Sequence, residues 1–286
     1  MKFQTLKTFI GAVAIAGTLA LTGQQAQAGT MHNGWNYSID SFNDGTEGSK
    51  VGKDSKFEFY GMAFKQTADK VIFAFNSNLA KTGYAYAHAA GGNIGYGDLM
   101  LDFTGKGNLT KANGGLQAVH FASNDMNRTV GLYDGVTAKS VATANSGYFS
   151  TNYHTSTVNS LKGKASYGDM ASNTTYFNGN EAALNVINTG TYKGGVTQLS
   201  NFKDLGLDFG HFKATGTQTF GFSIDKSLLP KGSFVASLFA ECGNDGVVLT
   251  GKVPEPSTLV GLAAVGLMVG ASQLRKRRNA AVLVEA

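Results

Sequence analysis

Short apolar and aromatic runs, separated by glycine and asparagine, recur along most of the chain. The run 217–224 places two phenylalanines and an isoleucine at alternate positions, so they would share one face of a strand. The run 56–60 alternates polar and apolar residues, as a half-buried strand should. In contrast, 71–75 is apolar throughout, which indicates a strand buried on both faces. The predicted strands are 35–40, 56–64, 70–75, 99–103, 116–122, 136–142, 205–209, 218–224, 233–240 and 247–250.

Turn-forming residues join these runs, and 38 of the 286 residues are glycine. Many short strands, without a convincing long segment of helical period, predict an all-β fold with a single β-sandwich. A jelly-roll-like order of strands is one form that such a sandwich takes. The polar segment 143–200 is expected to hold long loops or weaker strands, and 181–187 either a short helix or a loop. No charged or proline-rich linker interrupts residues 29–252, so we expect one domain there.

The first 28 residues have the features of a secretory signal peptide. Lys2 and Lys7 precede an apolar run over residues 9–21, which is too short to span a membrane comfortably. Ala26 and Ala28 then form a small-x-small site, so cleavage is expected directly after the second alanine.

A second apolar segment lies near the C-terminus. Residues 257–274 carry no charge, and as a helix they would span about 27 Å, close to the hydrocarbon thickness of a bilayer. A basic cluster follows at once and consists of Arg275, Lys276, Arg277 and Arg278. By the positive-inside rule this cluster stays in the cytoplasm, which places residues 29–252 on the outer side of the inner membrane.

A distinctive motif precedes this segment and consists of Val253, Pro254, Glu255 and Pro256. The motif, the apolar helix and the basic cluster resemble a PEP-CTERM sorting signal over residues 253–278, and residues 279–286 follow as a short tail. The resemblance implies that the chain is a substrate of exosortase, a membrane transpeptidase of Gram-negative bacteria with abundant exopolysaccharide. It also implies export through the Sec translocon, a transient stay in the inner membrane, cleavage near residues 254–256 and transfer to the cell surface. A plain single-pass anchor is the alternative.

The net charge of +5 arises at these two ends. Six of the 24 basic residues lie in the signal peptide or the basic cluster, and the acidic residues Glu255 and Glu285 also lie outside residues 29–252. This segment, the ectodomain, therefore has 18 basic and 17 acidic residues. Without a basic surplus, binding to nucleic acid has no support. The single cysteine, Cys242, excludes an intramolecular disulfide and a CxxC site.

Asn-Asp pairs follow apolar runs at three places and put Asp44, Asp125 and Asp245 in turn-forming sequences. With the neighbouring asparagines, these carboxylates are candidate ligands for calcium, which prefers hard oxygen atoms. No EF-hand or RTX spacing accompanies them, so solvated turn residues are the alternative, and no other cofactor is indicated. Residues 241–246 also look similar to the last hairpin of a subgroup of exosortase-dependent surface proteins. That resemblance brings no known chemistry.

No constellation in the sequence predicts catalysis. Asp98 and Asp102 would share a face of a strand about 13 Å apart, beyond the separations used in glycoside hydrolysis. The five histidines show no HxH or HExxH pattern, which disfavours a zinc site. We therefore expect a protein that is not an enzyme.

Aromatic residues suggest a class of ligand. Most should fill the core of a β-sandwich, but Tyr148, Tyr153 and Tyr176 lie in the polar middle segment, where tyrosine beside asparagine suits stacking on a sugar. The predicted function is that of an exported, exosortase-processed cell-surface or extracellular-matrix protein, acting in envelope, exopolysaccharide or biofilm structure or in adhesion. The alternatives are a carbohydrate-binding module and an enzyme that modifies matrix polysaccharide.

Overall fold

The computed structural model describes residues 29–254. Several features predicted from the sequence lie outside the described residues. They are the signal peptide with Ala26 and Ala28, the motif residues Glu255 and Pro256, the predicted helix 257–274, the basic cluster and the short tail. Within residues 29–254, no helix is both long and apolar enough to cross a membrane. This part of the chain is mostly β, as the sequence predicts, with few and short helices.

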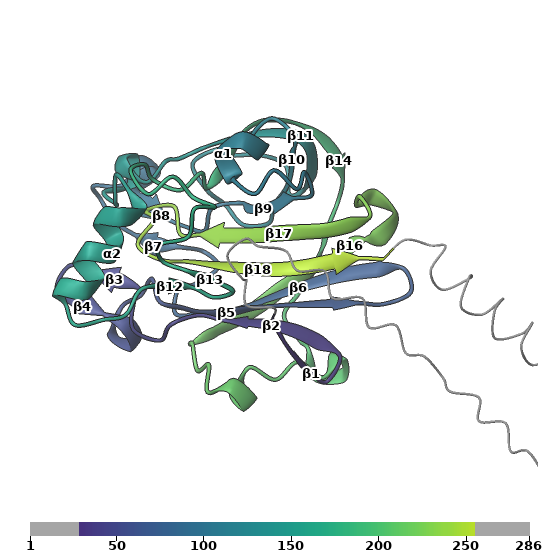
Figure 1. Cartoon of the computed structure of the whole chain (residues 1–286), viewed down its shortest axis with the longest axis horizontal. Coiled ribbons are helices and arrows are strands. Elements are labelled where there is room, and N and C mark those ends of the chain that lie inside the picture. The colour runs from purple at the N-terminus through teal and green to yellow at the C-terminus, as the bar shows by residue number, and fades with distance from the viewer. Residues whose placement is uncertain (1–28, 255–286) are drawn as a thin grey trace, which may run out of the picture.

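Two six-stranded antiparallel sheets form the body of the fold (Figure 1). In spatial order, the first sheet contains β1 (Thr30–His32), β2 (Trp35–Ile39), β5 (Phe59–Gln66), β6 (Lys70–Ser77), β16 (Gln218–Asp225) and β15 (Thr197–Leu199). The second contains β14 (Val186–Gly194), β11 (Gly131–Lys139), β10 (Leu116–His120), β9 (Leu99–Asp102), β17 (Gly232–Phe239) and β18 (Gly246–Val253).

The remaining elements are short. Three two-stranded ribbons pair β3 (Thr46–Glu47) with β4 (Lys50–Val51), β7 (Tyr84–Ala85) with β8 (Asn93–Ile94), and β12 (Ser166–Tyr167) with β13 (Met170–Ala171). The helices are α1 (Leu109–Ala112), α2 (Thr151–Ser160) and the 3-10 helices Gly52–Asp54, Ala90–Gly92, Thr143–Asn145, Lys203–Leu205, Gly210–Phe212 and Lys226–Leu228. In Figure 1, α2 and the short strands β3, β4, β7, β8 and β12 gather at one end of the sheets, here called the α2 end.

The two sheets share an apolar core that is rich in aromatic side chains. β16 pairs with β6 so that Phe222 lies opposite Phe73, and both are buried. From the second sheet, Phe234 of β17 packs edge-on against Phe73 with ring centroids 6.0 Å apart. The alternation of run 217–224 therefore places its large side chains between the sheets, where aromatic contacts add to the burial of apolar area.

The outer faces of both sheets are covered as well. Residues 199–214 fold over the first sheet, where the Nε1 of Trp35 donates to the carbonyl oxygen of Leu205 at 2.9 Å. Helix α1 and parts of the segment 167–187 pack on the second sheet in a separate apolar cluster. β6 is consequently buried on both faces, which confirms the interpretation of the continuous apolar run 71–75.

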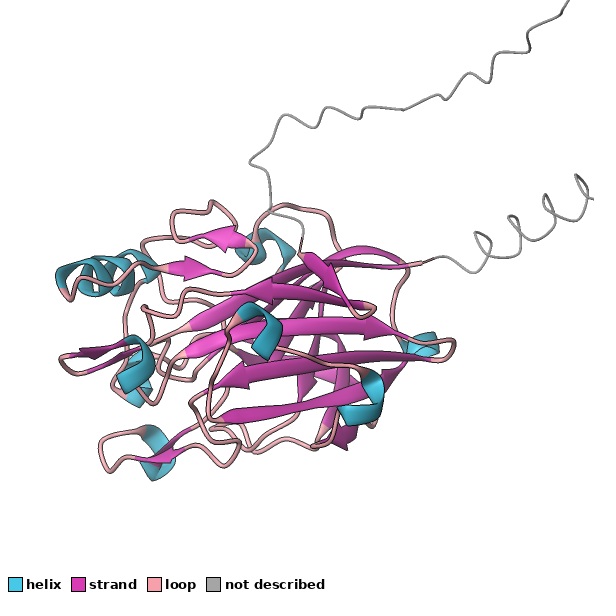
Figure 2. Cartoon of the chain, turned by 90° about the horizontal axis from the view of Figure 1, so that it is seen from below, coloured by secondary structure: helices cyan, strands magenta, loops and turns pink. Residues whose placement is uncertain are grey.

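Side chains also connect the sheets at both edges. At one edge, Ser38 of β2 donates through Oγ to the carbonyl oxygen of Val248 in β18 at 2.6 Å. At the other, Gln198 of β15 donates through Nε2 to the carbonyl oxygen of Phe121 at 2.8 Å. Figure 2 shows the strands inside the molecule and the helices at its periphery. The sheets are thus held by directional bonds as well as by the core.

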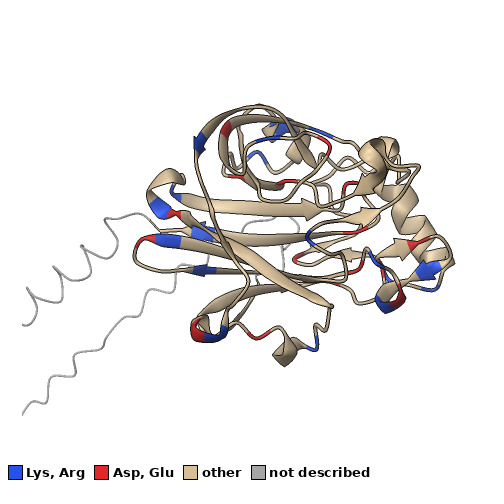
Figure 3. Ribbon diagram, turned by 180° about the vertical axis from the view of Figure 1, so that it is seen from behind, with Lys and Arg blue, Asp and Glu red and all other residues tan. Residues whose placement is uncertain are grey.

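Charged residues on the surface lie in mixed groups, and Figure 3 shows basic and acidic residues side by side at several turns. Lys56 Nζ lies 2.7 Å from Glu47 Oε1, and Lys70 Nζ lies 3.8 Å from Asp225 Oδ2. Exposed pairs of this kind contribute about 0–1 kcal/mol each. The fold therefore depends mainly on what it buries.

The strand predicted at 205–209 is wrong. Lys203–Leu205 is a 3-10 helix, and Gly206 adopts a φ of +72°, which interrupts an extended chain. The apolar side chains here pack on the outer face of the first sheet instead of joining it. The other predicted strands coincide with strands of the structure, with different bounds. β5 begins three residues later than predicted, β11 begins five and ends three residues earlier, and β18 ends three residues later.

The polar segment 143–200 contains more regular structure than the sequence indicated. It holds helix α2 as well as β14, and residues 181–187 lead as a loop into that strand. Successive strands form hairpins within one sheet at β5–β6, β9–β10–β11 and β17–β18. A jelly roll is instead built from Greek keys, so the observed order is closer to packed meanders.

Replacement of Phe222 by alanine should lower the free energy of unfolding by about 3–5 kcal/mol, because it removes a fully buried ring and leaves a cavity. Ser223 is the matched control on the opposite face of β16, and its replacement by alanine should change stability by less than about 0.5 kcal/mol. Denaturant unfolding measures both. Equal losses for the two variants would contradict the assigned inner face.

Candidate functional site

Four acidic side chains converge at the α2 end of the sheets. Asp40 follows β2, Asp44 lies in the loop toward β3, Glu58 precedes β5, and Asp245 lies in the turn between β17 and β18. Each is at most 5% exposed. We call these four residues the carboxylate cluster. Burial of one acidic residue is unusual, and four together require a specific explanation.

Backbone N–H groups hold each carboxylate of the cluster in place. The donors are Gly168 for Asp40, Ser166 for Asp44, Gly45 for Glu58, and both Phe59 and Gly246 for Asp245, at 2.7–2.8 Å. The Ser166 hydroxyl also donates to Asp40. Hydrogen bonds to an ionised acceptor are short and strong, so the chain fixes the orientation of each carboxylate.

Three carboxylate oxygens of the cluster accept no hydrogen bond although they are buried. They are Oδ2 of Asp40, Oδ1 of Asp44 and Oε1 of Glu58. The hydroxyl of Tyr167, itself 1% exposed, is also unpartnered, and its pKa is raised by burial and by the charges of Asp245, Asp40 and Asp44. Unpartnered buried polar atoms are rare in folded proteins.

One ligand atom from each of Asp40, Asp44 and Asp245 lies within 4.8 Å of the others. These three residues, with Glu58 beside them, are therefore the group best placed to hold a cation of the hard, oxygen-preferring kind. A second group with the same spacing combines His32, Asp208 and His211. In that group Asp208 and His211 are exposed, and the two imidazole rings stack at 3.8 Å.

Burial and mutual repulsion shift the proton affinity of the cluster. Loss of hydration raises the pKa of Asp40 to about 7, and loss of hydration together with the Asp40 charge raises that of Glu58 to about 8. The pKa values of Asp44 and Asp245 lie well above the ordinary range for the same reasons. His154, whose Nε2 lies 3.1 Å from the Asp44 carbonyl oxygen, has a pKa lowered by burial to about 4. It is therefore neutral and offers no compensating charge.

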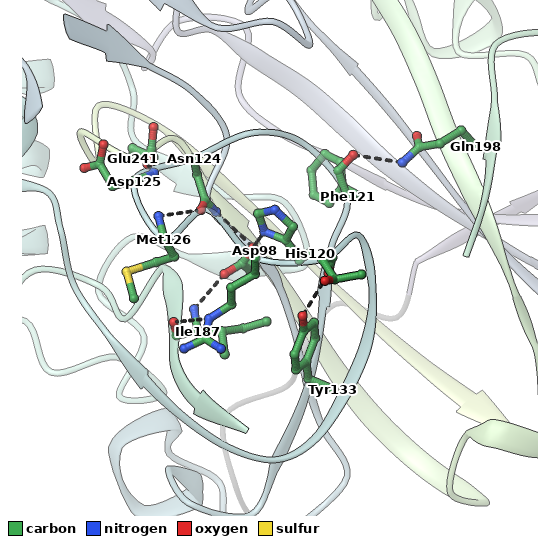
Figure 4. A network of polar contacts seen from close by, with 12 residues as sticks. Asp98, His120, Phe121, Asn124, Asp125, Met126, Tyr133, Ile187, Gln198 and Glu241 are labelled. Carbon is green, nitrogen blue, oxygen red and sulfur yellow. Dashed lines mark hydrogen bonds and ion pairs between the residues drawn. The ribbon is translucent and has the colours of Figure 1, made fainter. Parts of the chain in front are cut away.

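A second polar network surrounds Asp98 (Figure 4). Its Oδ1 accepts from His120 Nδ1 at 2.8 Å and from Asn124 Nδ2 at 3.0 Å, while Oδ2 accepts from the backbone N–H of Ile187 at 2.6 Å. Both oxygens of Asp98 are thus occupied by internal donors. Asp102 at the other end of β9 has its own partners, including the Tyr176 hydroxyl at 3.1 Å. The two aspartates do not form a pair that shares one reacting centre.

The structure places the three predicted calcium ligands at two sites. Asp44 and Asp245 lie together in the carboxylate cluster, and both are fully buried, so the alternative of solvated turn residues is wrong for them. Asp125 lies elsewhere: its backbone N–H donates to Glu241 Oε1 at 2.8 Å. The three similar turn sequences belong to different loops, and the tertiary structure brings only two of these loops together.

The sequence did not single out Asp40 or Glu58. Glu58 lies between Phe57 and Phe59 in a run whose alternation predicts a solvent-facing polar position, yet all three side chains are buried. Asp40 directly follows the strand β2. An isolated acidic residue within or next to an apolar run is a signal that could have found both.

The three candidate tyrosines differ in their surroundings. Tyr176 is 3% exposed and bonded to Asp102, so its prediction as a surface ligand is wrong. Tyr148 is partly buried and accepts a hydrogen bond from Thr46 Oγ1 at 3.0 Å. Tyr153 on α2 is 51% exposed and stacks on Phe149, which is 59% exposed, with centroids 4.7 Å apart. These two rings form an exposed aromatic pair.

The features described so far define a chain of two six-stranded antiparallel sheets with a buried carboxylate cluster at one end. Comparisons with protein-family models, with curated proteins and with solved structures gave no match in any of the three. The function is therefore argued from the geometry of this chain and from its sequence pattern.

The raised pKa values predict that stability in the absence of a bound cation falls as the pH rises. Asp40 and Glu58 keep their protons in the folded chain up to about 7 and about 8, whereas their ordinary values are 3.8 and 4.5. The tighter binding of these protons by the folded chain contributes fully to stability below about pH 4. This contribution decreases as the pH rises and is lost once the pH has passed about 8. Because a tenfold difference in proton affinity corresponds to about 1.4 kcal/mol, the free energy of unfolding should fall by several kcal/mol.

Denaturant unfolding in a metal chelator, repeated from about pH 5 to about pH 8, measures this dependence. The double variant Asp40→Asn with Glu58→Gln should show a flatter profile, because neither side chain titrates. A profile of the unmodified chain that rises over this range would show that the cluster is ionised in the folded state.

Proposed function

We propose that the chain is an exported, exosortase-processed surface protein that acts without catalysis in the envelope or the extracellular polysaccharide matrix. The observation that carries this proposal is the position of the last described strand relative to the motif. β18 ends at Val253, which is fully buried, and Pro254 of the motif follows immediately. The described strands are therefore complete at the residue where the segment resembling a sorting signal begins.

This arrangement suits cleavage near residues 254–256. Both six-stranded sheets would stay intact, because every strand described in residues 29–254 ends at or before Val253. Proline lacks the N–H that a further ladder bond would need, so Pro254 marks a natural end to the edge strand. A processing enzyme acting at this motif would cut directly after the last described strand.

In this proposal the signal peptide directs the chain to the Sec translocon. The apolar segment 257–274, predicted from the sequence as a helix, would then hold the chain transiently in the inner membrane, with the basic cluster on the cytoplasmic side. Exosortase cleaves near the motif and transfers the ectodomain to the cell surface. There the ectodomain works by display, through adhesion or through contacts of its loops with exopolysaccharide.

Replacement of both Pro254 and Glu255 by alanine should block processing. We expect the unprocessed chain to accumulate in the inner membrane, because the anchor remains while the cleavage motif is lost. Cell fractionation with immunodetection measures this. Lys252→Ala, an exposed position just before the motif, is the matched control and should be processed normally. Unchanged surface delivery of the double variant would exclude sorting through this motif.

A second candidate function, a carbohydrate-binding module, is favoured by the exposed pair of Phe149 and Tyr153. Adjacent exposed aromatic rings offer a flat apolar surface on which a sugar ring can stack. Display and sugar binding are compatible, since a displayed protein can contact the matrix through such a pair.

Tyr153→Ala should weaken binding to the polysaccharide of the producing cell by about two- to tenfold, as expected for one aromatic contact of about 0.5–1.5 kcal/mol. Glycan arrays or affinity electrophoresis measure this. Tyr192→Ala is the control, since Tyr192 is 47% exposed but lies on β14. Equal binding by both variants and the unmodified chain would exclude the aromatic pair as the contact. Release of reducing sugar would instead favour an enzyme that modifies the matrix.

A further inference from the structure

The carboxylate cluster concentrates acidic groups that no basic side chain neutralises. Among residues 29–254, the ion pairs of the chain involve other residues than Asp40, Asp44, Glu58 and Asp245. An ionised carboxylate that is buried without a partner is very unfavourable. The cluster therefore needs either bound protons or a bound cation.

The geometry of the free oxygens favours a cation. In Asp40, Asp44 and Glu58, one oxygen is held by a backbone N–H and the other is unpartnered. This division leaves one ligand oxygen per side chain in a fixed orientation. The hydroxyl of Tyr167, which is buried and unpartnered, experiences the charges of three members of the cluster and adds a further oxygen near them.

We infer that the carboxylate cluster binds one calcium ion. The ligand atoms of Asp40, Asp44 and Asp245 lie within 4.8 Å of one another, and oxygens on opposite sides of a calcium ion lie about 4.6–5.2 Å apart. The acidic residues supply the charge that a divalent ion requires. The inference does not depend on the proposed export or display.

The donor set distinguishes calcium from other metals. All the candidate ligands are oxygens, whereas zinc sites use histidine and cysteine. His154 points Nε2 at the Asp44 carbonyl oxygen, and Cys242 is a protonated thiol, because burial raises its pKa to about 12. Magnesium usually keeps several of its waters, whereas the acidic side chains of the cluster are at most 5% exposed to solvent.

Bound calcium would join segments that are distant in sequence. Asp40 and Asp44 belong to the loop after β2, Glu58 to the start of β5, and Asp245 to the β17–β18 turn. Ser166 and Gly168 add the β12 ribbon through their bonds to the same carboxylates. Since the ion binds the folded arrangement and not the separate segments, it should stabilise the whole α2 end.

The test measures calcium binding to the purified full chain after removal of metal with a chelator. Calorimetry should show one calcium ion per chain, with a dissociation constant of about 10⁻⁴ M or lower. The unfolding temperature should be higher in about 1 mM calcium than in chelator, since a ligand that binds only the folded state raises stability. Magnesium at the same concentration should give a smaller rise.

Asp44→Asn is the most informative variant. The amide oxygen can still accept from the N–H of Ser166, while one charge of the cluster is lost. The calcium affinity should therefore fall by about tenfold or more, the loss expected when a charged ligand is removed. In chelator the variant should be at least as stable as the unmodified chain, because repulsion is relieved. Glu58→Gln provides the same test if the first variant does not fold.

Two control variants each remove a carboxylate that lies outside the cluster. Asp204→Asn removes an exposed carboxylate, and Asp125→Asn alters the turn bonded to Glu241. Both variants should bind calcium as the unmodified chain does. If the unmodified chain binds no calcium and unfolds at one temperature in calcium and in chelator, the cluster holds protons and the inference is wrong. A calcium response that Asp44→Asn and Glu58→Gln leave unchanged would place the ion elsewhere and equally overturn it.

Discussion

Buried carboxylates that accept backbone N–H groups hold the loops of this fold in place. The β17–β18 turn shows this most clearly, because Glu241 and Asp245 are both buried and all four of their oxygens are used. Their donors are the N–H groups of Asp125, Gly95, Phe59 and Gly246. A carboxylate suits this position better than an amide, since it is only an acceptor and its bonds are stronger. One turn thereby fixes the loop after β10, the residues before β9 and the start of β5.

This constraint explains how long, irregular connections can accompany a regular core. The aromatic core holds the sheets together but is not directional, and it does not determine where a loop lies. The side-chain bonds from Ser38 to β18 and the carboxylate bonds at the α2 end provide that direction. When they are ionised, the same carboxylates carry a charge that the apolar core cannot stabilise. The loops are therefore ordered by groups whose own ionisation the protein must control.

The sequence predicts the core strands well because their side chains follow simple periods. Runs such as 70–75 and 218–224 are buried on the faces that their patterns indicate. β14 was not predicted, because beyond Val186 and Ile187 it is largely exposed and polar. Helix α2 is rich in threonine, serine and asparagine, which are weak helix formers, and it begins where the Ser150 side chain accepts from the N–H of Tyr153. Its stability comes from tertiary contacts and a cap, which a periodicity does not reveal.

The candidate site was only half predictable for a related reason. Turn sequences mark Asp44 and Asp245, but only the tertiary structure shows that they meet each other and not Asp125. Glu58 follows the pattern of an exposed strand residue and is buried because the β17–β18 turn and the loop after β2 cover it. A pattern along one strand carries no information about what other segments place on its outer face.

The separation of the bonded partners along the chain has a consequence for the order of folding. The bond from Phe59 to Asp245 joins positions 186 residues apart, and that from Ser38 to Val248 joins positions 210 residues apart. The N-terminal strands cannot complete these contacts until the β17–β18 hairpin has formed and packed against them. Contacts between residues so far apart in sequence form slowly. The first half of the described fold can therefore complete its hydrogen bonds only after the residues of β17 and β18 are present and paired.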